Sequence, residues 1–157
     1  MRRITVLTTL LALLVFSAAP AVAEPDQPRV HKAVLSGDSE VPAVDSEGRG
    51  LAIFNLSEDG IRFKLVVRGI DEVTQAHIHL GAPGENGPVV AFLFGFFEGG
   101  VTQNGLLAKG NITEADLVGP LAGQPLSALA DAIRSGNAYV NVHTVDHPGG
   151  EIRGQIE

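Results

Sequence analysis

Hydrophobic and polar residues alternate along much of the chain, which is the pattern of β-strands with one buried face. The alternation is clearest in residues 61–68, where Ile, Phe, Leu and Val hold the odd positions and three basic residues stand among the even ones. Residues 51–56 alternate in the same way, and the turn-forming sequence Ser-Glu-Asp-Gly separates the two segments. We therefore predict a β-hairpin with one buried face.

Further short segments rich in β-forming residues follow, each bounded by turn-forming residues. Besides the hairpin, the expected strands are residues 30–35, the segment around His77 and His79, and residues 89–97, 106–112, 138–145 and 151–156. Two short helices are also expected, one capped by Thr113 and one from Leu126 to Arg134 that Gly136 closes. About eight short strands with one or two short helices indicate an all-β fold, a β-sandwich.

The segment 89–97 is almost wholly apolar and holds four of the seven phenylalanines, at positions 92, 94, 96 and 97. It is too short to span a membrane, which takes roughly 20 apolar residues. We therefore expect this strand to form the aromatic centre of the core.

The charged residues near the strands are expected to be structural. Glu40 is adjacent to a prolyl segment and is expected to be exposed, while Glu151 and Arg153 share one face of the last strand. Ion pairing is the expected role of all three. The Gly84–Pro88 loop lacks the lysine and the following helix of a phosphate-binding loop, so a structural turn is expected there.

The N-terminus has the order of a secretory signal peptide. Two arginines precede a 13-residue apolar run from Ile4 to Phe16, and Ala-Val-Ala stands before Glu24. We predict that residues 1–23 are removed on export, that residues 24–29 are a flexible lead-in, and that residues 30–157 form one domain. No transmembrane segment is expected in the mature chain, and the expected location is extracellular, periplasmic or at the cell surface.

Charge and cysteine content narrow the function. The chain has 11 basic and 18 acidic residues, and removal of two leader arginines would leave a mature charge of 9 − 18 = −9. Nucleic acid is not expected as a partner, because phosphate binding relies on clustered Lys and Arg. The absence of cysteine excludes disulfides, thiol catalysis and zinc held by thiolates.

The candidate chemistry lies in residues 75–90, which read QAHIHLGAPGENGPVV. In a strand, His77 and His79 would lie on one face, side by side, just before a glycine- and proline-rich turn. Imidazole pairs at this spacing are suited to copper or zinc. The alternative is that these histidines hydrogen-bond loop backbone and hold the turn in place.

Several segments together resemble the CHRD domain, a module named after the chordin protein. The matching pieces are LSG with EVP at residues 35–42, AHIHLGAPGENGPVV, Ile112-Thr113 through the GPL at residues 119–121, and GNAYVNVHT with HPGGEIRGQI. They extend from about residue 30 to residue 157. The family is defined by sequence, so this resemblance implies a domain rather than a specific activity.

The segments HIH at residues 77–79, NVHT at residues 141–144 and PGGEIRGQI at residues 148–156 resemble copper/zinc superoxide dismutase more weakly. This likeness implies a Greek-key β-sandwich of the superoxide dismutase or immunoglobulin type. By this likeness, His77, His79 and His143 would occupy copper-ligand positions. His147 lies four residues after His143 and across an expected turn, so its position suggests a fourth ligand or a gate. Counterparts of the bridging histidine and of the zinc-binding cluster are missing, so a complete dismutase site is not expected. Copper is thus the more favoured cofactor, ahead of zinc.

These observations favour a secreted, single-domain, non-catalytic binding module that interacts with an extracellular or envelope partner. No Ser-His-Asp order or carboxylate pair indicates hydrolysis. The competing hypothesis is a copper-binding redox protein or copper carrier that uses the three-histidine site. A third possibility is a structural envelope component in which the histidines only brace a loop.

Overall fold

Eight antiparallel strands form one continuous sheet in the computed structural model, which describes residues 30–157. The predicted leader, 1–23, and the lead-in, 24–29, lie outside the described residues. The strands are β1 Val30–Ser36, β2 Arg49–Ser57, β3 Gly60–Arg68, β4 Val73–Leu80, β5 Val89–Phe94, β6 Gly105–Ile112, β7 Ala138–Thr144 and β8 Ile152–Gln155. Their order across the sheet is β5-β4-β7-β8-β1-β2-β3-β6.

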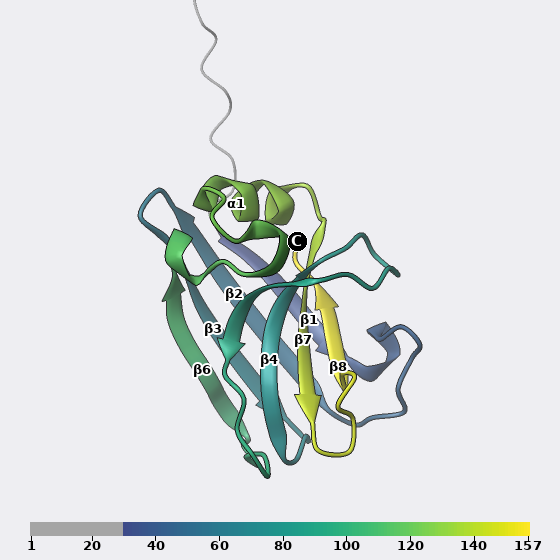
Figure 1. Cartoon of the computed structure of the whole chain (residues 1–157). Helices are drawn as coiled ribbons and strands as arrows, with labels where there is room; N and C mark the ends of the chain where they lie inside the picture. The colour runs from purple at the N-terminus through teal and green to yellow at the C-terminus, as the bar shows by residue number, and fades with distance from the viewer. Residues whose placement is uncertain (1–29) are drawn as a thin grey trace, which may run out of the picture.

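The sheet curls into a nearly closed barrel. Its two edge strands, β5 and β6, lie near each other, and β4, β7 and β8 stand in front of β1 and β2 in Figure 1. Following the chain from β4 through β5 and β6, β7 returns to pair with β4, which is a Greek-key connection. The predicted all-β sandwich of about eight strands is confirmed, with the two halves of one curled sheet as its two layers.

One 3-10 turn, Gly37–Ser39, follows β1. The segment between β6 and β7 contains the remaining helices and covers one end of the barrel (Figure 1). Thr113 caps a 3-10 turn, Glu114–Asp116, through a capping box with Asp116. Another 3-10 turn, Gly119–Leu121, precedes α1, Leu126–Arg134, which buries Leu129 and Ile133. Gly136 follows α1 with a φ of 70°, so the predicted helix and its glycine closure are confirmed. No helix among the described residues has the length and apolar character needed to cross a membrane.

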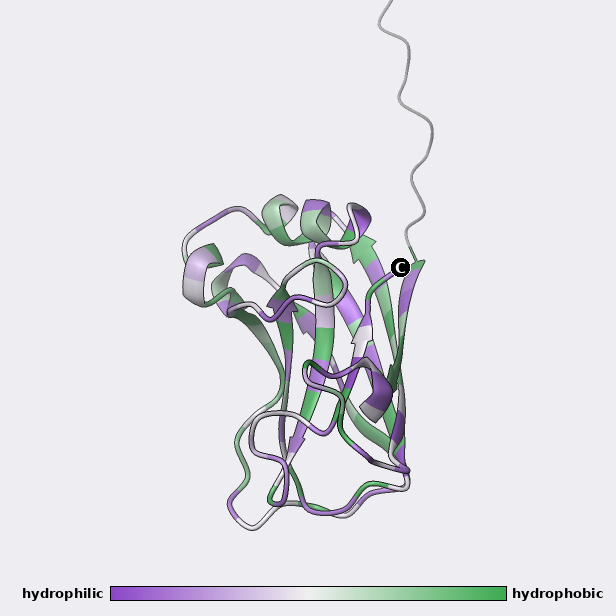
Figure 2. Cartoon of the chain, turned by 90° about the vertical axis from the view of Figure 1, so that its right-hand side faces the viewer, coloured by the Kyte–Doolittle hydropathy of each residue, from purple (hydrophilic) through white to green (hydrophobic). Residues whose placement is uncertain are grey.

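The alternation of hydrophobic and polar residues along the strands places aliphatic side chains in the barrel interior. The hydrophobic and hydrophilic bands alternate along the strands in Figure 2. In the predicted hairpin, β2 and β3 pair from Arg49↔Arg68 to Ser57↔Gly60 and bury Phe54, Phe63 and Leu65. Burial of this continuous apolar face is what stabilises the barrel.

The predicted aromatic centre of the core is wrong. Strand β5 ends at Phe94, and Phe92, Phe96 and Phe97 are 49%, 70% and 51% exposed. Val90, Ala91 and Leu93 are the buried residues of this edge strand, whose register against β4 is irregular, and residues 95–97 lie beyond its last residue. The buried phenylalanines are those of the hairpin instead, because only there does the strict alternation point every aromatic ring inward.

This difference gives a matched test of the core. We expect Phe54→Ala to lower the free energy of unfolding by about 3–5 kcal/mol, because it leaves a cavity in the barrel. Phe96→Ala removes the same ring from an exposed position and should change the free energy by less than about 0.5 kcal/mol. Urea denaturation measures both, and equal losses would contradict this description of the core.

Candidate metal centre

The register between β4 and β7 brings the predicted histidines together. Ile78 pairs with Val140, and these residues face the barrel interior. The alternate positions on the same two strands therefore point to the outer face, where His77 and His79 of β4 stand beside His143 of β7. Residues more than sixty positions apart in the sequence thus become neighbours.

Although they lie on the outer face, the three histidines are buried. His77, His79 and His143 are 4%, 8% and 6% exposed. The glycine-rich loop at residues 81–88 folds back over the strand, with Leu80 N–H donating to the Pro88 carbonyl. Gly87 is required there, since a Cβ would overlap the Leu80 carbonyl oxygen. The loop thus shields the outer face of β4 from water.

Backbone carbonyls fix the tautomers of two rings. His79 Nδ1 lies 2.9 Å from the Gly87 carbonyl oxygen, and His143 Nδ1 lies 3.0 Å from that of Pro148. A carbonyl oxygen only accepts, so each Nδ1 carries the proton and donates it. The Nε2 atoms of both rings are therefore left with free lone pairs. Histidine metal ligands are oriented in this way by a hydrogen bond from the second nitrogen.

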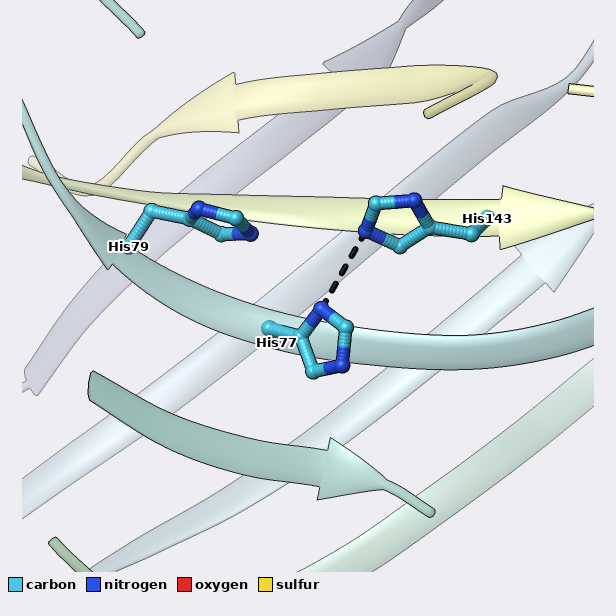
Figure 3. Close-up of side chains that lie close together, drawn as sticks. All are labelled: His77, His79 and His143. Atoms are coloured by element: carbon cyan, nitrogen blue, oxygen red, sulfur yellow. Dashed lines mark hydrogen bonds between the residues drawn. The ribbon is translucent and has the colours of Figure 1, made fainter. Parts of the chain in front are cut away.

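The third ring completes the cluster. His77 Nδ1 lies 3.2 Å from His143 Nε2 and donates to it, because that Nε2 has no proton. Figure 3 shows His79 Nε2 directed toward this pair of rings, whereas His77 Nε2 points away from His143. One ligand atom from each ring lies within 4.8 Å of the others, so all three lie within about 3 Å of a common point, against ligand distances of about 2 Å in metal sites.

Burial keeps the rings neutral. It lowers the pKa of His77 to about 4, with His143 and His79 adding smaller repulsive contributions. Burial also lowers the pKa of His79 and of His143, against the opposing effect of their backbone hydrogen bonds. Neutral imidazoles at physiological pH offer lone pairs rather than charges, which is what a metal ion requires.

Aromatic contacts hold two of the rings in place. His79 stacks on Tyr139 at a centroid distance of 4.9 Å. The guanidinium carbon of Arg153, a residue of β8, lies 3.5 Å from the centre of the Tyr139 ring. His77 meets the half-exposed Phe92 edge to face at 4.7 Å. Tyr139 and Phe92 were not predicted from the sequence to lie at this site. Strand alternation was a usable signal for Tyr139, because residues 139, 141 and 143 share one face of β7.

His147 does not join the cluster. It is half-buried in the turn after β7, where its backbone N–H donates to Thr144 Oγ1, and the group of ligand atoms found among the described residues contains only the other three histidines. The local spacing suggested a fourth ligand, but the turn between β7 and β8 takes this residue past the end of the strand pair.

The charged residues differ from the expectation. Glu40 is buried, not exposed, and accepts a hydrogen bond from Asn141 Nδ2 at 3.3 Å. Burial raises its pKa to about 7, against the opposing charge of Arg153. Arg153 donates to Asn86 and to the Glu85 carbonyl, and Glu151 accepts from the hydroxyls of Ser46 and Thr144. These residues anchor the loops over the outer face through neutral partners.

The depressed pKa can be measured directly. In metal-free protein, we expect the His77 ring resonances to titrate near pH 4 in an NMR titration, well below the 6.5 of a free imidazole. Because the folded pKa lies below the unfolded one, this contribution to stability is complete above about pH 6.5 and is lost as the pH falls toward 4. Titration of His77 near pH 6.5 would contradict the buried, neutral cluster.

Comparison with known families supports the resemblance drawn from the sequence. The family model described as the CHRD domain matches residues 31–156, nearly the whole of the described chain. A search of curated proteins gave no match, and a search of solved structures gave none either. The match covers well over half of the sequence, and the chain belongs to the CHRD domain family.

Proposed function

We propose that this CHRD domain is a binding module that holds one transition-metal ion, with copper preferred. The ligands would be Nδ1 of His77 and Nε2 of His79 and His143. The observation that carries the proposal is the convergence of three buried, neutral imidazoles, with one nitrogen of each within 4.8 Å of the others.

An unpartnered nitrogen supports this proposal. His79 Nε2 is buried without a hydrogen-bond partner, and such a buried polar atom costs about 1–3 kcal/mol. A metal ion would satisfy His79 Nε2 directly. His77 would bind through Nδ1 after its proton moves to Nε2, the nitrogen that points away from the cluster (Figure 3).

The alternative role, a brace for the loops, explains only half of the geometry. It accounts for the Nδ1 atoms of His79 and His143, which donate to loop carbonyls. It does not account for the third histidine, His77. It also does not explain why the Nε2 atoms of His79 and His143 point toward the cluster and away from the loops. A brace and a metal site are compatible, since the carbonyls orient the rings for the ion.

The donor set favours copper. All three ligands are imidazoles, without the thiolates of structural zinc sites or the oxygen donors that magnesium and calcium prefer. Divalent copper also binds a given nitrogen site more tightly than its first-row neighbours. No separate observation in the described residues favours redox turnover over binding. We also propose that residues 1–23 direct export, so that the site would be loaded outside the cytoplasm.

Copper titration tests the proposal with a matched control. We expect one equivalent of Cu(II) to give a d–d absorbance band, and His143→Ala to weaken binding by at least roughly 100-fold, because it removes a ligand. His147→Ala removes a histidine outside the cluster and should leave the affinity unchanged. The titration uses the chain from Glu24 onward.

Two outcomes would overturn the metal site. One is no saturable band at equimolar copper. The other is equal loss of binding in His143→Ala and His147→Ala, which would indicate scattered surface binding. Circular dichroism of both variants without copper separates ligand loss from unfolding.

A further inference from the structure

The outer surface of the barrel opposite the histidines is rich in basic residues. The outer face of β1, β2, β3 and β6 contains Lys32, Arg49, Arg62, Lys64, Arg68 and Lys109. These are six of the eight basic residues in the described chain, and the four strands contain none of its 16 acidic residues. All 16 acidic residues lie outside the eight strands, in the turns, loops and helices that connect them and at the C-terminus. We call these six residues the basic face.

The register orders this face into rows. Across the four strands, Lys32 is aligned with Ile53, Lys64 and Lys109. The next row is wholly aliphatic and exposed: Val34 66%, Leu51 38%, Val66 40% and Leu106 45%. Beyond it, Arg49 is directly opposite Arg68. An apolar row thus lies between two basic rows, and each full row spans roughly 14 Å at the usual strand spacing.

The arrangement does not serve the stability of the sheet. Like charges directly opposite each other destabilise a strand pair, and this face has two such pairs, Lys64↔Lys109 and Arg49↔Arg68. No acidic side chain among the described residues forms an ion pair with any of the six, since the ion pair found there joins Arg134 to Asp131. A ligand with negative charge would relieve the repulsion.

We propose that the basic face docks the domain on an anionic phospholipid surface. Lysine and arginine side chains would contact the phosphates of the headgroups, and the aliphatic row would reach the boundary with the acyl chains. The exposed aliphatic residues favour lipid over a soluble polyanion, which offers them no apolar partner. The outward positions of these strands hold no aromatic residue for stacking on sugars or bases.

Docking in this way would leave the metal centre free. Strands β4 and β7, which hold the three histidines, lie in the opposite layer of the barrel from β1 and β2 (Figure 1). The histidine cluster and Phe92 would therefore face away from the lipid, toward the solvent. This inference does not depend on metal binding, and either property could be lost without the other.

Vesicle flotation tests the basic face. The probe is phosphatidylcholine vesicles with or without phosphatidylglycerol, and the chain begins at Glu24 so that the apolar N-terminal run cannot enter the lipid. We expect binding only when phosphatidylglycerol is present, with a roughly 30-fold loss in the variant Lys64→Gln/Lys109→Gln, because each cation near the surface contributes about fivefold. Arg134→Gln, which removes a charge from α1, should bind within about twofold of the native chain.

The aliphatic row has its own isosteric test. The double variant Val34→Thr/Val66→Thr keeps the side-chain shape and β-propensity, and we expect it to bind these vesicles at least roughly fivefold more weakly. Equal binding to neutral vesicles, or no difference between Lys64→Gln/Lys109→Gln and Arg134→Gln, would overturn the proposal. So would binding to heparin or duplex DNA with none to the vesicles, which would assign the face to a polyanion. Unfolding midpoints of all variants confirm that the barrel is intact.

Discussion

The antiparallel register between β4 and β7 is the constraint on which the candidate site depends. It sets Ile78 against Val140 inside the barrel and thereby turns His77, His79 and His143 outward on adjacent strands. A shift of one residue would place the imidazoles in the apolar core and the aliphatic side chains on the surface. Core packing therefore stabilises the barrel and positions the cluster through the same alternation.

Two loops complete the histidine site that the strands position. On most of the barrel the outer face meets solvent, but over β4, β7 and β8 the glycine-rich loop and the β7–β8 turn cover it. The loop carbonyls orient two of the imidazoles. Burial of the rings beneath these loops lowers their pKa values and keeps all three neutral. The opposite half keeps a bare outer face of cations and aliphatic residues. One curled sheet thus presents two unlike surfaces, one covered by loops around the neutral histidine cluster and the other exposed and basic.

Local patterns in the sequence predicted the local elements well. Strict alternation in the β2–β3 hairpin and helical spacing in α1 are decided by neighbours in the chain, and both were correct. The placement of Phe92, Glu40 and His147 depends on sheet edges, loop paths and turns, which local patterns do not specify. His143 was identified through a family-level likeness. The basic face was hidden because net charge sums over the whole chain, in which the acidic residues of the turns and loops outnumber the basic residues of the strands.

A crystal structure of the copper-loaded protein would show whether the three imidazoles bind one ion. We expect one copper ion about 2 Å from His77 Nδ1, His79 Nε2 and His143 Nε2, with the Nδ1 atoms of His79 and His143 still donating to Gly87 and Pro148. Copper bound at His147 or at surface carboxylates, with none among the three rings, would contradict a metal centre at the cluster.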